Sequence, residues 1–183
     1  GRAYLDERIR IENPTDGVHP YYFWNCTAFP NRPGTRFIYP MSLGTDHNAR
    51  EFFRWPIHEG RDLTWLKNYP TYASVFSVDC SYDFFGAYDV EADRGIVQVA
   101  NHHELGGKKA WTWGEWEFGK VAQRNLTDDD GPYIEVQSGP LPTQSDYGML
   151  GPHERVAWQE YWYPVHGLGD GLEFATQDIA AQT

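Results

Sequence analysis

The sequence predicts an all-β fold, an antiparallel β-sandwich. Short runs of aromatic and β-branched residues recur along the chain, and almost none of it has the 3.6-residue period of an amphipathic helix. Gly, Pro, Asn or Asp bracket each run, and the chain holds 18 Gly and 12 Pro. Aromatic residues make up 16% of it, which suits the half-buried faces of paired strands. Since 183 residues supply one sizeable core, we expect residues 1–183 to form a single domain.

The expected strands are eight runs: Tyr21–Trp24, Arg36–Tyr39, Tyr72–Val78, Phe84–Tyr88, Ile96–Ala100, Lys109–Trp113, Tyr133–Gln137 and Val156–Tyr163. The fourth and fifth should form a hairpin, because the connection between them is polar and ends in Gly95, where a positive φ is easily held. The stretch from Arg36–Tyr39 to Tyr72 shows little regular pattern, and loops this long in a compact domain are usually functional. No helix longer than about three turns is expected.

The charge balance limits the classes of partner. Lys and Arg number 15 against 26 Asp and Glu, which gives a net charge of −11. A chain this acidic repels phosphate backbones and anionic lipid, so we expect no nucleic-acid partner and no membrane contact. No apolar run approaches the roughly 20 residues that a membrane span needs, and no charged-then-apolar leader opens the sequence. We therefore expect a cytoplasmic protein, and the initial Gly suggests a piece of a longer one.

The cysteines and the paired histidines do not have the spacing of a metal site. Cys26 and Cys80 allow one disulfide at most, and their spacing is unlike that of a zinc site. We expect both to be reduced and buried, and the disulfide stays open. His102 and His103 are adjacent, so on a strand they would face opposite ways and could not easily share an ion. No metal and no cofactor are expected.

The strand within Gly131–Gly139 separates its side chains by face. Ile134 and Val136 point one way, while Tyr133, Glu135 and Gln137 point the other. An aromatic ring, a carboxylate and an amide together suit sugar hydroxyls, because they offer a stacking plane and several hydrogen-bonding groups. The alternative is an exposed polar face without a ligand.

A second strand offers a similar face. Lys109, Trp111 and Trp113 share one side, where two indoles and an ammonium could stack a pyranose and donate to its hydroxyls. The alternative is that the indoles are core and Lys109 reaches outward to solvent. We expect the two strands to line one concave surface of the sandwich. Weaker candidates for the same surface are Trp24, Asn25 and Asp83.

These residues resemble a known family. Gly131–Gly139 is similar to the strand that carries the Glu-Thr-Gln motif in galactose mutarotase and related aldose 1-epimerases. The resemblance puts Glu135 at the catalytic glutamate and Gln137 at the glutamine. Further matching segments are Leu150–Glu154 and Trp158–Val165, similar to that family's Leu-x-Pro-Gly-Glu turn and closing strand, and Ile9–Asn13 with Tyr21–Phe29, similar to its opening strand pair.

The whole chain resembles most closely the uncharacterised mutarotase-like domain found ahead of tetratricopeptide repeats in bacterial proteins. The segments that carry this resemblance are Trp24-Asn25, Asp83–Gly86, Lys108–Gly114 and Gly131–Gly139. It implies a galactose mutarotase-like supersandwich, either whole or as an incomplete fragment that leaves an edge strand open. It also implies contacts with a tetratricopeptide region of the same protein, and an oligomer is possible.

The resemblance leaves two functions open. In the first, the domain is carbohydrate-active, similar to a glycosidase or epimerase, with Glu135 as general acid or base and His102 or His103 as the complementary group. In the second, it is a non-catalytic carbohydrate-binding or structural module. Cys26 stands where the mutarotases have a catalytic histidine, and a thiol of pKa near 8.5 is a poor substitute for that acid, which argues against simple aldose mutarotation.

Overall fold

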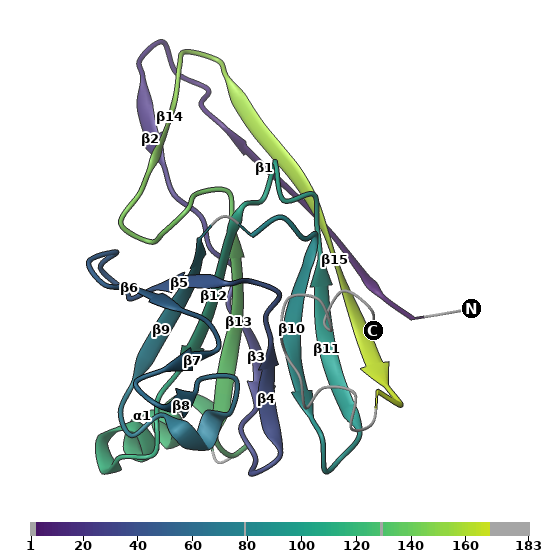
Figure 1. The fold of residues 1–183 in the computed structure, drawn as a ribbon. Coiled ribbons are helices and arrows are strands. Elements are labelled where there is room, and N and C mark those ends of the chain that lie inside the picture. The colour runs from purple at the N-terminus through teal and green to yellow at the C-terminus, as the bar shows by residue number, and fades with distance from the viewer. Residues whose placement is uncertain (1–2, 79, 129, 169–183) are drawn as a thin grey trace.

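The computed structural model describes residues 3–78, 80–128 and 130–168 of the chain. Two antiparallel sheets face one another, and this confirms the predicted all-β sandwich (Figure 1). The five-stranded sheet has the order β1 (Leu5–Glu12), β15 (Arg155–His166), β11 (Arg94–Val99), β10 (Phe84–Asp89) and β4 (Thr35–Ile38). The six-stranded sheet has the order β3 (Thr27–Pro30), β13 (Tyr133–Gly139), β12 (Gly107–Thr112), β9 (Ala73–Val78), β5 (Leu43–Thr45) and β6 (Phe52–Arg54).

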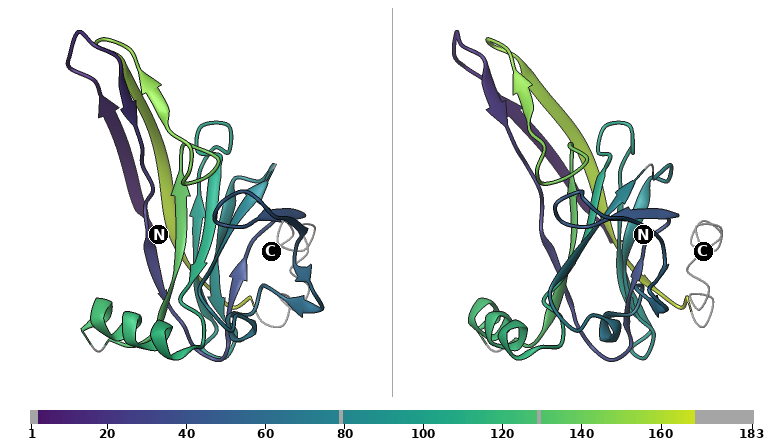
Figure 2. Two further views of the ribbon diagram at one scale, coloured as in Figure 1. Left: turned by 90° about the vertical axis from the view of Figure 1, so that its left-hand side faces the viewer. Right: turned by 60° about the vertical axis from the view of Figure 1, so that its left-hand side comes forward.

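Two short strand pairs complete the β structure. β7 (Ile57–His58) pairs with β8 (Arg61–Asp62), and β2 (His19–Tyr21) pairs with β14 (Gly148–Leu150). The β2–β14 pair and the adjoining ends of β1 and β15 form an arm that extends beyond the sandwich (Figure 2). The Asn13 amide ties the arm together, because it donates to the carbonyls of Gly17 at 2.7 Å and Gly151 at 2.8 Å.

The helical content is small. α1 (Glu117–Thr127) has 11 residues, which is about three turns, and η1 (Leu66–Asn68) is a single 3₁₀ turn. α1 lies at the lower end of the six-stranded sheet in Figure 1. Across the described ranges, no helix has the length and apolar character that would carry it through a bilayer.

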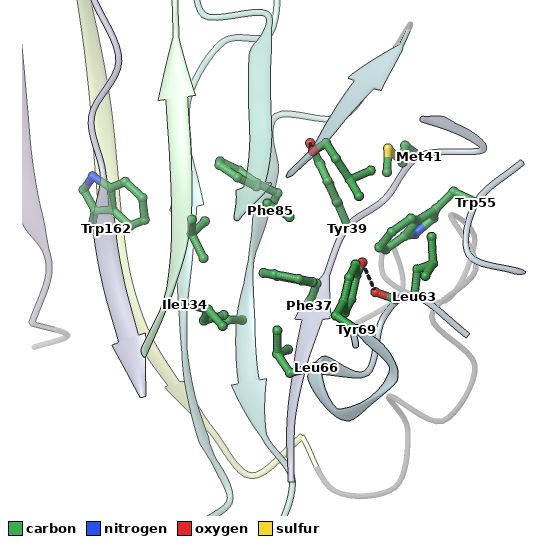
Figure 3. Close-up of a cluster of buried hydrophobic side chains, with 14 residues drawn as sticks. Phe37, Tyr39, Met41, Trp55, Leu63, Leu66, Tyr69, Phe85, Ile134 and Trp162 are labelled. Carbon is green, nitrogen blue, oxygen red and sulfur yellow. Dashed lines mark hydrogen bonds between the residues drawn. The ribbon is translucent and has the colours of Figure 1, made fainter. Parts of the chain in front are cut away.

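The core lies between the sheets, where β4 and β10 meet β12, β13 and β9 (Figure 3). Phe37, Phe85 and Ile134 are at most 2% exposed, and fully burying such a side chain stabilises the fold by about 1.5–3 kcal/mol. The Tyr39 hydroxyl donates to the carbonyls of Val75 and Lys108. Because Ile134 and Val136 point into this core, the alternate residues of β13 point away from it, as their period predicts.

Three sequence expectations need correction. Most of the run Tyr21–Trp24 lies outside strands, since β2 ends at Tyr21. Residues 40–71 are not one irregular loop, because β5 and β6 in this stretch extend the six-stranded sheet. The β10–β11 hairpin forms as predicted, but its positive φ of 50° belongs to Asp93. Gly95 lies inside β11, where a Cβ would overlap the Ala87 carbonyl oxygen.

The cysteines are free thiols, but they are not buried. Cys26 is exposed and Cys80 is half-buried. Cys26 directly precedes β3, on the outward side of the six-stranded sheet. The expectation of two buried cysteines was wrong because Cys26 lies at a sheet edge, which the surrounding sequence pattern does not reveal.

Candidate functional site

The outward face of the six-stranded sheet brings the two polar–aromatic strands together. Across β12 and β13, Lys109 lies opposite Gln137 and Trp111 lies opposite Glu135. The rings of Trp111 and Trp113 meet edge to face, with centroids 5.3 Å apart. We call these six residues the outer-face cluster: Lys109, Trp111, Trp113, Tyr133, Glu135 and Gln137. Cross-strand pairing fixes their spacing, so the backbone register alone places an indole beside a carboxylate.

A chain of hydrogen bonds runs through the polar half of the outer-face cluster. The Lys109 ammonium donates to Gln137 Oε1 at 3.2 Å and to Gln144 Oε1 at 2.7 Å. Gln144 Nε2 also donates to Gln137 Oε1, at 3.1 Å, and Gln137 Nε2 donates to Glu135 Oε2 at 2.6 Å. The Gln137 side chain therefore bridges the Lys109 ammonium and the Glu135 carboxylate. Gln144, from the loop after β13, contacts the Gln137 amide.

Lys109 does not reach outward to solvent. It is 3% exposed, and its ammonium lies 4.9 Å from the Trp111 ring centroid and 5.6 Å from that of Phe76. Burial lowers the pKa of Lys109 to about 8, and the negative charge of Glu135 opposes this change. At neutral pH the group is still mostly protonated, yet it can release its proton far more readily than an ordinary lysine.

Glu135 is half-buried, with two weakly acidic groups beside it. Cys26 is exposed as a whole residue, but partial burial of its thiol raises the thiol pKa to about 11, and the Glu135 charge acts in the same direction. Burial also raises the pKa of the Tyr133 phenol, again assisted by Glu135. Both neighbours therefore remain protonated at neutral pH and can donate hydrogen bonds to the carboxylate or to a ligand.

His47 is a site residue that the sequence reasoning missed. Its Nδ1 lies 3.0 Å from Ser74 Oγ on β9, and its ring contacts the rings of Phe76 and Trp111. Burial and the nearby Lys109 charge lower the pKa of His47, which favours the neutral imidazole. The sequence hinted at this site only indirectly. The alternation of the Tyr72–Val78 run places Ser74 and Phe76, the residues that His47 contacts, on the outward face.

Trp24 forms a wall next to the outer-face cluster. Its indole lies over the paired glycines Gly107 and Gly139, where a Cβ on either residue would come within 3 Å of indole carbons. The ring also meets Phe76 edge to face at 5.5 Å. The two glycines thus clear space for an indole that comes from outside the sheet.

Asn25 is directed into the interior instead. It donates to Glu160 Oε2 at 2.8 Å and accepts from the Ser138 backbone N–H at 3.0 Å. Gln98 Nε2 and Ser138 Oγ also donate to Glu160 Oε2, at 3.0 and 2.6 Å. These contacts stabilise a buried carboxylate between the sheets, so Asn25 positions the segment before β3.

Asp83, His102 and His103 form a separate group at the β10 and β11 ends. Asp83 Oδ1 lies 2.7 Å from His102 Nδ1 and accepts the His102 backbone N–H at 2.9 Å. The rings of His102 and His103 are 3.9 Å apart. Within the described residues, no hydrogen bond or ring contact joins either histidine to the outer-face cluster. The structure therefore does not bring either histidine into contact with Glu135.

The described residues also line an apolar cavity of about 560 Å³ at another place. It lies between the two sheets, where the edge strands β1 and β3 face one another, and its wall includes Leu5, Phe29 and Trp162. Glu7 is the one carboxyl group in this lining, and its wall is mostly apolar, without the cluster of convergent polar groups that the outer face has. We therefore locate the candidate site at the outer-face cluster rather than in this cavity.

Comparisons with known proteins agree with the architecture. The family described as "Domain of unknown function (DUF5107)" matches residues 1–165. A TPR-domain containing protein from Parabacteroides distasonis is 27% identical, with a TM-score of 0.78, over 88% of this chain and 28% of its own. A galactose mutarotase-like protein from Clostridium acetobutylicum is 12% identical, with a TM-score of 0.60, over 88% of this chain and 52% of its own.

A candidate aldose 1-epimerase from Klebsiella pneumoniae is 11% identical, with a TM-score of 0.60, over 98% of this chain and 45% of its own. The chain thus spans between about a quarter and a half of the proteins that it resembles. The likeness to the candidate epimerase and to the mutarotase-like protein establishes the fold, a galactose mutarotase-like β-sandwich, and confirms the resemblance drawn from the sequence motifs.

Proposed function

The chain belongs to the family described as "Domain of unknown function (DUF5107)", and we propose that it recognises carbohydrate through the outer-face cluster. One observation carries this proposal: the register of β12 and β13 sets Trp111 beside Glu135 and Lys109 beside Gln137. An aromatic plane next to a carboxylate, an ammonium and an amide can stack one face of a sugar ring and bond its hydroxyls. The shared fold with a galactose mutarotase-like protein supports the same ligand class.

The cluster also supports proton-transfer chemistry at a sugar's anomeric centre. The Glu135 carboxylate can accept the proton of the anomeric hydroxyl while the ring C–O bond breaks. Lys109 is 3% exposed and donates to Gln144, so it can give a proton to the ring oxygen once the sugar displaces the Gln144 side chain. Lys109 suits this role because its pKa of about 8 keeps it protonated at pH 7 but close to the working pH. Cys26, with a pKa of about 11, is the weaker acid.

The test is Glu135→Gln, which keeps the volume of the side chain but removes its charge. Neutral monosaccharides and oligosaccharides are first screened on a glycan array, and those that bind are assayed for anomeric exchange and bond cleavage. For an enzyme, we expect turnover to fall by roughly 10²–10⁴-fold while affinity changes only a few-fold. Glu104→Gln, an exposed carboxylate in the β11–β12 loop, is the matched control.

The outcomes separate the two functions. If both Glu135→Gln and the original chain bind sugar equally and neither turns it over, the domain is a binding module. Full activity in the Gln variant would remove Glu135 from the mechanism. Failure of every sugar to bind would reject the proposed function itself.

A further inference from the structure

Aromatic side chains continue from the outer-face cluster to the open surface beside α1. The Tyr72 ring stacks with Trp111, with centroids 6.0 Å apart and planes inclined by 26°. Trp116 follows at 5.8 Å from Tyr72, and Phe118 follows at 5.3 Å from Trp116. We call this series the aromatic track: Trp111, Tyr72, Trp116 and Phe118.

The outer members of the track are open to solvent. Tyr72 is 55% exposed, Trp116 36% and Phe118 59%, although each contacts another ring. Tyr72 precedes β9 in the same alternation as Ser74 and Phe76, so it continues the outward face of the six-stranded sheet. Single exposed aromatics are ordinary on a protein surface, but a contiguous series that ends at the candidate site indicates binding.

The track is held rigidly at Trp116. Its Nε1 donates to the Trp113 carbonyl at 3.0 Å, which fixes the direction of the indole. A Cβ on Gly119 would overlap that carbonyl oxygen and lie 2.9 Å from Trp116 Cδ1, so the glycine lets the indole lie against the helix. A ring that is already ordered loses little conformational entropy when a ligand stacks on it.

The turn that carries Trp116 is fixed against the segment that carries Tyr72. Gly114 has a φ of +70°, and a Cβ there would overlap the backbone of Thr71. The Glu115 N–H donates to the Tyr69 carbonyl at 3.1 Å. The backbone segments that carry Tyr72 and Trp116 are therefore held next to one another without a ligand.

We propose that the ligand of this site is a neutral oligosaccharide of several units, not a single sugar. This inference rests on the proposed function and extends it. One unit contacts Glu135 and the part of Trp111 that Lys109 and Tyr72 leave open, and the following units stack on the exposed rings of Tyr72, Trp116 and Phe118. The ring-to-ring steps are comparable to the breadth of a pyranose, whose apolar face stacks on such planes. The net charge of −11 disfavours polyanionic glycans.

Binding is measured by calorimetry with gluco-, manno-, galacto- and xylo-oligosaccharides of one to six units. We expect affinity to rise with chain length until the track is filled. Trp116→Ala and Tyr72→Ala should each lower the affinity for the longer chains by roughly tenfold. Trp116→Ala should leave the affinity for the monosaccharide unchanged, because the Trp116 ring contacts Tyr72 and Phe118 and lies beyond the Trp111 unit. Tyr4→Ala is the matched control. Tyr4 is 54% exposed and also contacts other aromatic rings, but these rings belong to β15 in the opposite sheet, so its loss should not change the affinity.

Phe118→Ala tests the aromatic track a second time, by the affinity for the longer chains, without removing the hydrogen bond from Trp116 to the Trp113 carbonyl. Equal affinity for one unit and for six, or no loss in the three track variants, would overturn the oligosaccharide inference while the proposed function stands. Binding of polygalacturonate in preference to every neutral chain would overturn the choice of a neutral ligand. If no glycan binds at all, both the inference and the proposed function fail.

Discussion

Lys109→Met tests the electrostatics of the candidate site through protein stability. The folded chain holds the Lys109 proton with a pKa of about 8, against 10.5 for an unperturbed lysine. Because the folded state binds this proton less tightly than the unfolded chain, the contribution of Lys109 to the free energy of unfolding rises as the pH increases through this window. The Met variant lacks this dependence, so the difference between the two proteins should change with pH.

The size of the change follows from the two pKa values. One pKa unit corresponds to about 1.36 kcal/mol, and integrating the proton binding from pH 7 to pH 9.5 gives a gain of about 2 kcal/mol for the original chain relative to Lys109→Met. Urea unfolding at both pH values measures this gain, since titrating groups that do not interact with Lys109 cancel in the difference between the two proteins. Lys120→Met, which removes an exposed lysine on α1, should show no such change.

A difference between the original chain and Lys109→Met that stays constant from pH 7 to 9.5 would refute the reasoning. NMR of ¹³C-labelled lysine provides an independent reading without any variant. One ε-carbon signal should titrate with a midpoint of about pH 8, and its disappearance in Lys109→Met assigns it.

Two further predictions concern other ionisable groups. At pH 8 the pKa of about 11 lowers the thiolate fraction of Cys26 about 100-fold relative to an unperturbed thiol. A thiolate of higher pKa is about tenfold more nucleophilic, which offsets part of this loss of rate. Alkylation of Cys26, measured on the peptide that contains it, should therefore be about tenfold slower than alkylation of an unperturbed thiol. Glu135→Gln should accelerate the alkylation of Cys26, and an unchanged alkylation rate would contradict the influence of Glu135 on the thiol. Burial and the facing Glu160 raise the pKa of Glu7, so Glu7 stabilises the fold below pH 4.5 and this contribution is lost as the pH rises through the folded pKa. The melting temperature of the Glu7→Gln variant should therefore be higher than that of the original chain at pH 7 but not at pH 4. A lower melting temperature of the variant at pH 7 would contradict this.

The sequence predicted the strands at the centre of the sheets and the faces that they present. Tyr133–Gln137 alternates strictly between apolar and polar side chains, so its outward residues could be named without coordinates. Strands such as β5 and β7 have three and two residues, which is too short to show a period. They pair because the chain around them is already packed, and such tertiary effects leave no local pattern.

The sequence predicted one part of the candidate site and not the other, again because only regular strands show a period. Its β12 and β13 residues follow from alternation, but Gln144 and His47 come from irregular segments whose positions depend on the folded sheet. The adjacent pair His102 and His103 was conspicuous in sequence, yet its contacts are with Asp83 and with each other. Adjacency in sequence is a poor guide to a site that is assembled across strands.

The amide of Gln137 has a consequence for how this site holds two opposite charges. Within the described residues, no direct ion pair joins Lys109 to Glu135, because the amide accepts from one and donates to the other. A glutamate of the same shape could not donate to Glu135 unless it kept a proton, and a methionine would leave both charges without this partner. The neutral amide therefore keeps the ammonium and the carboxylate from forming a direct ion pair, and each of them keeps hydrogen-bonding capacity for other partners.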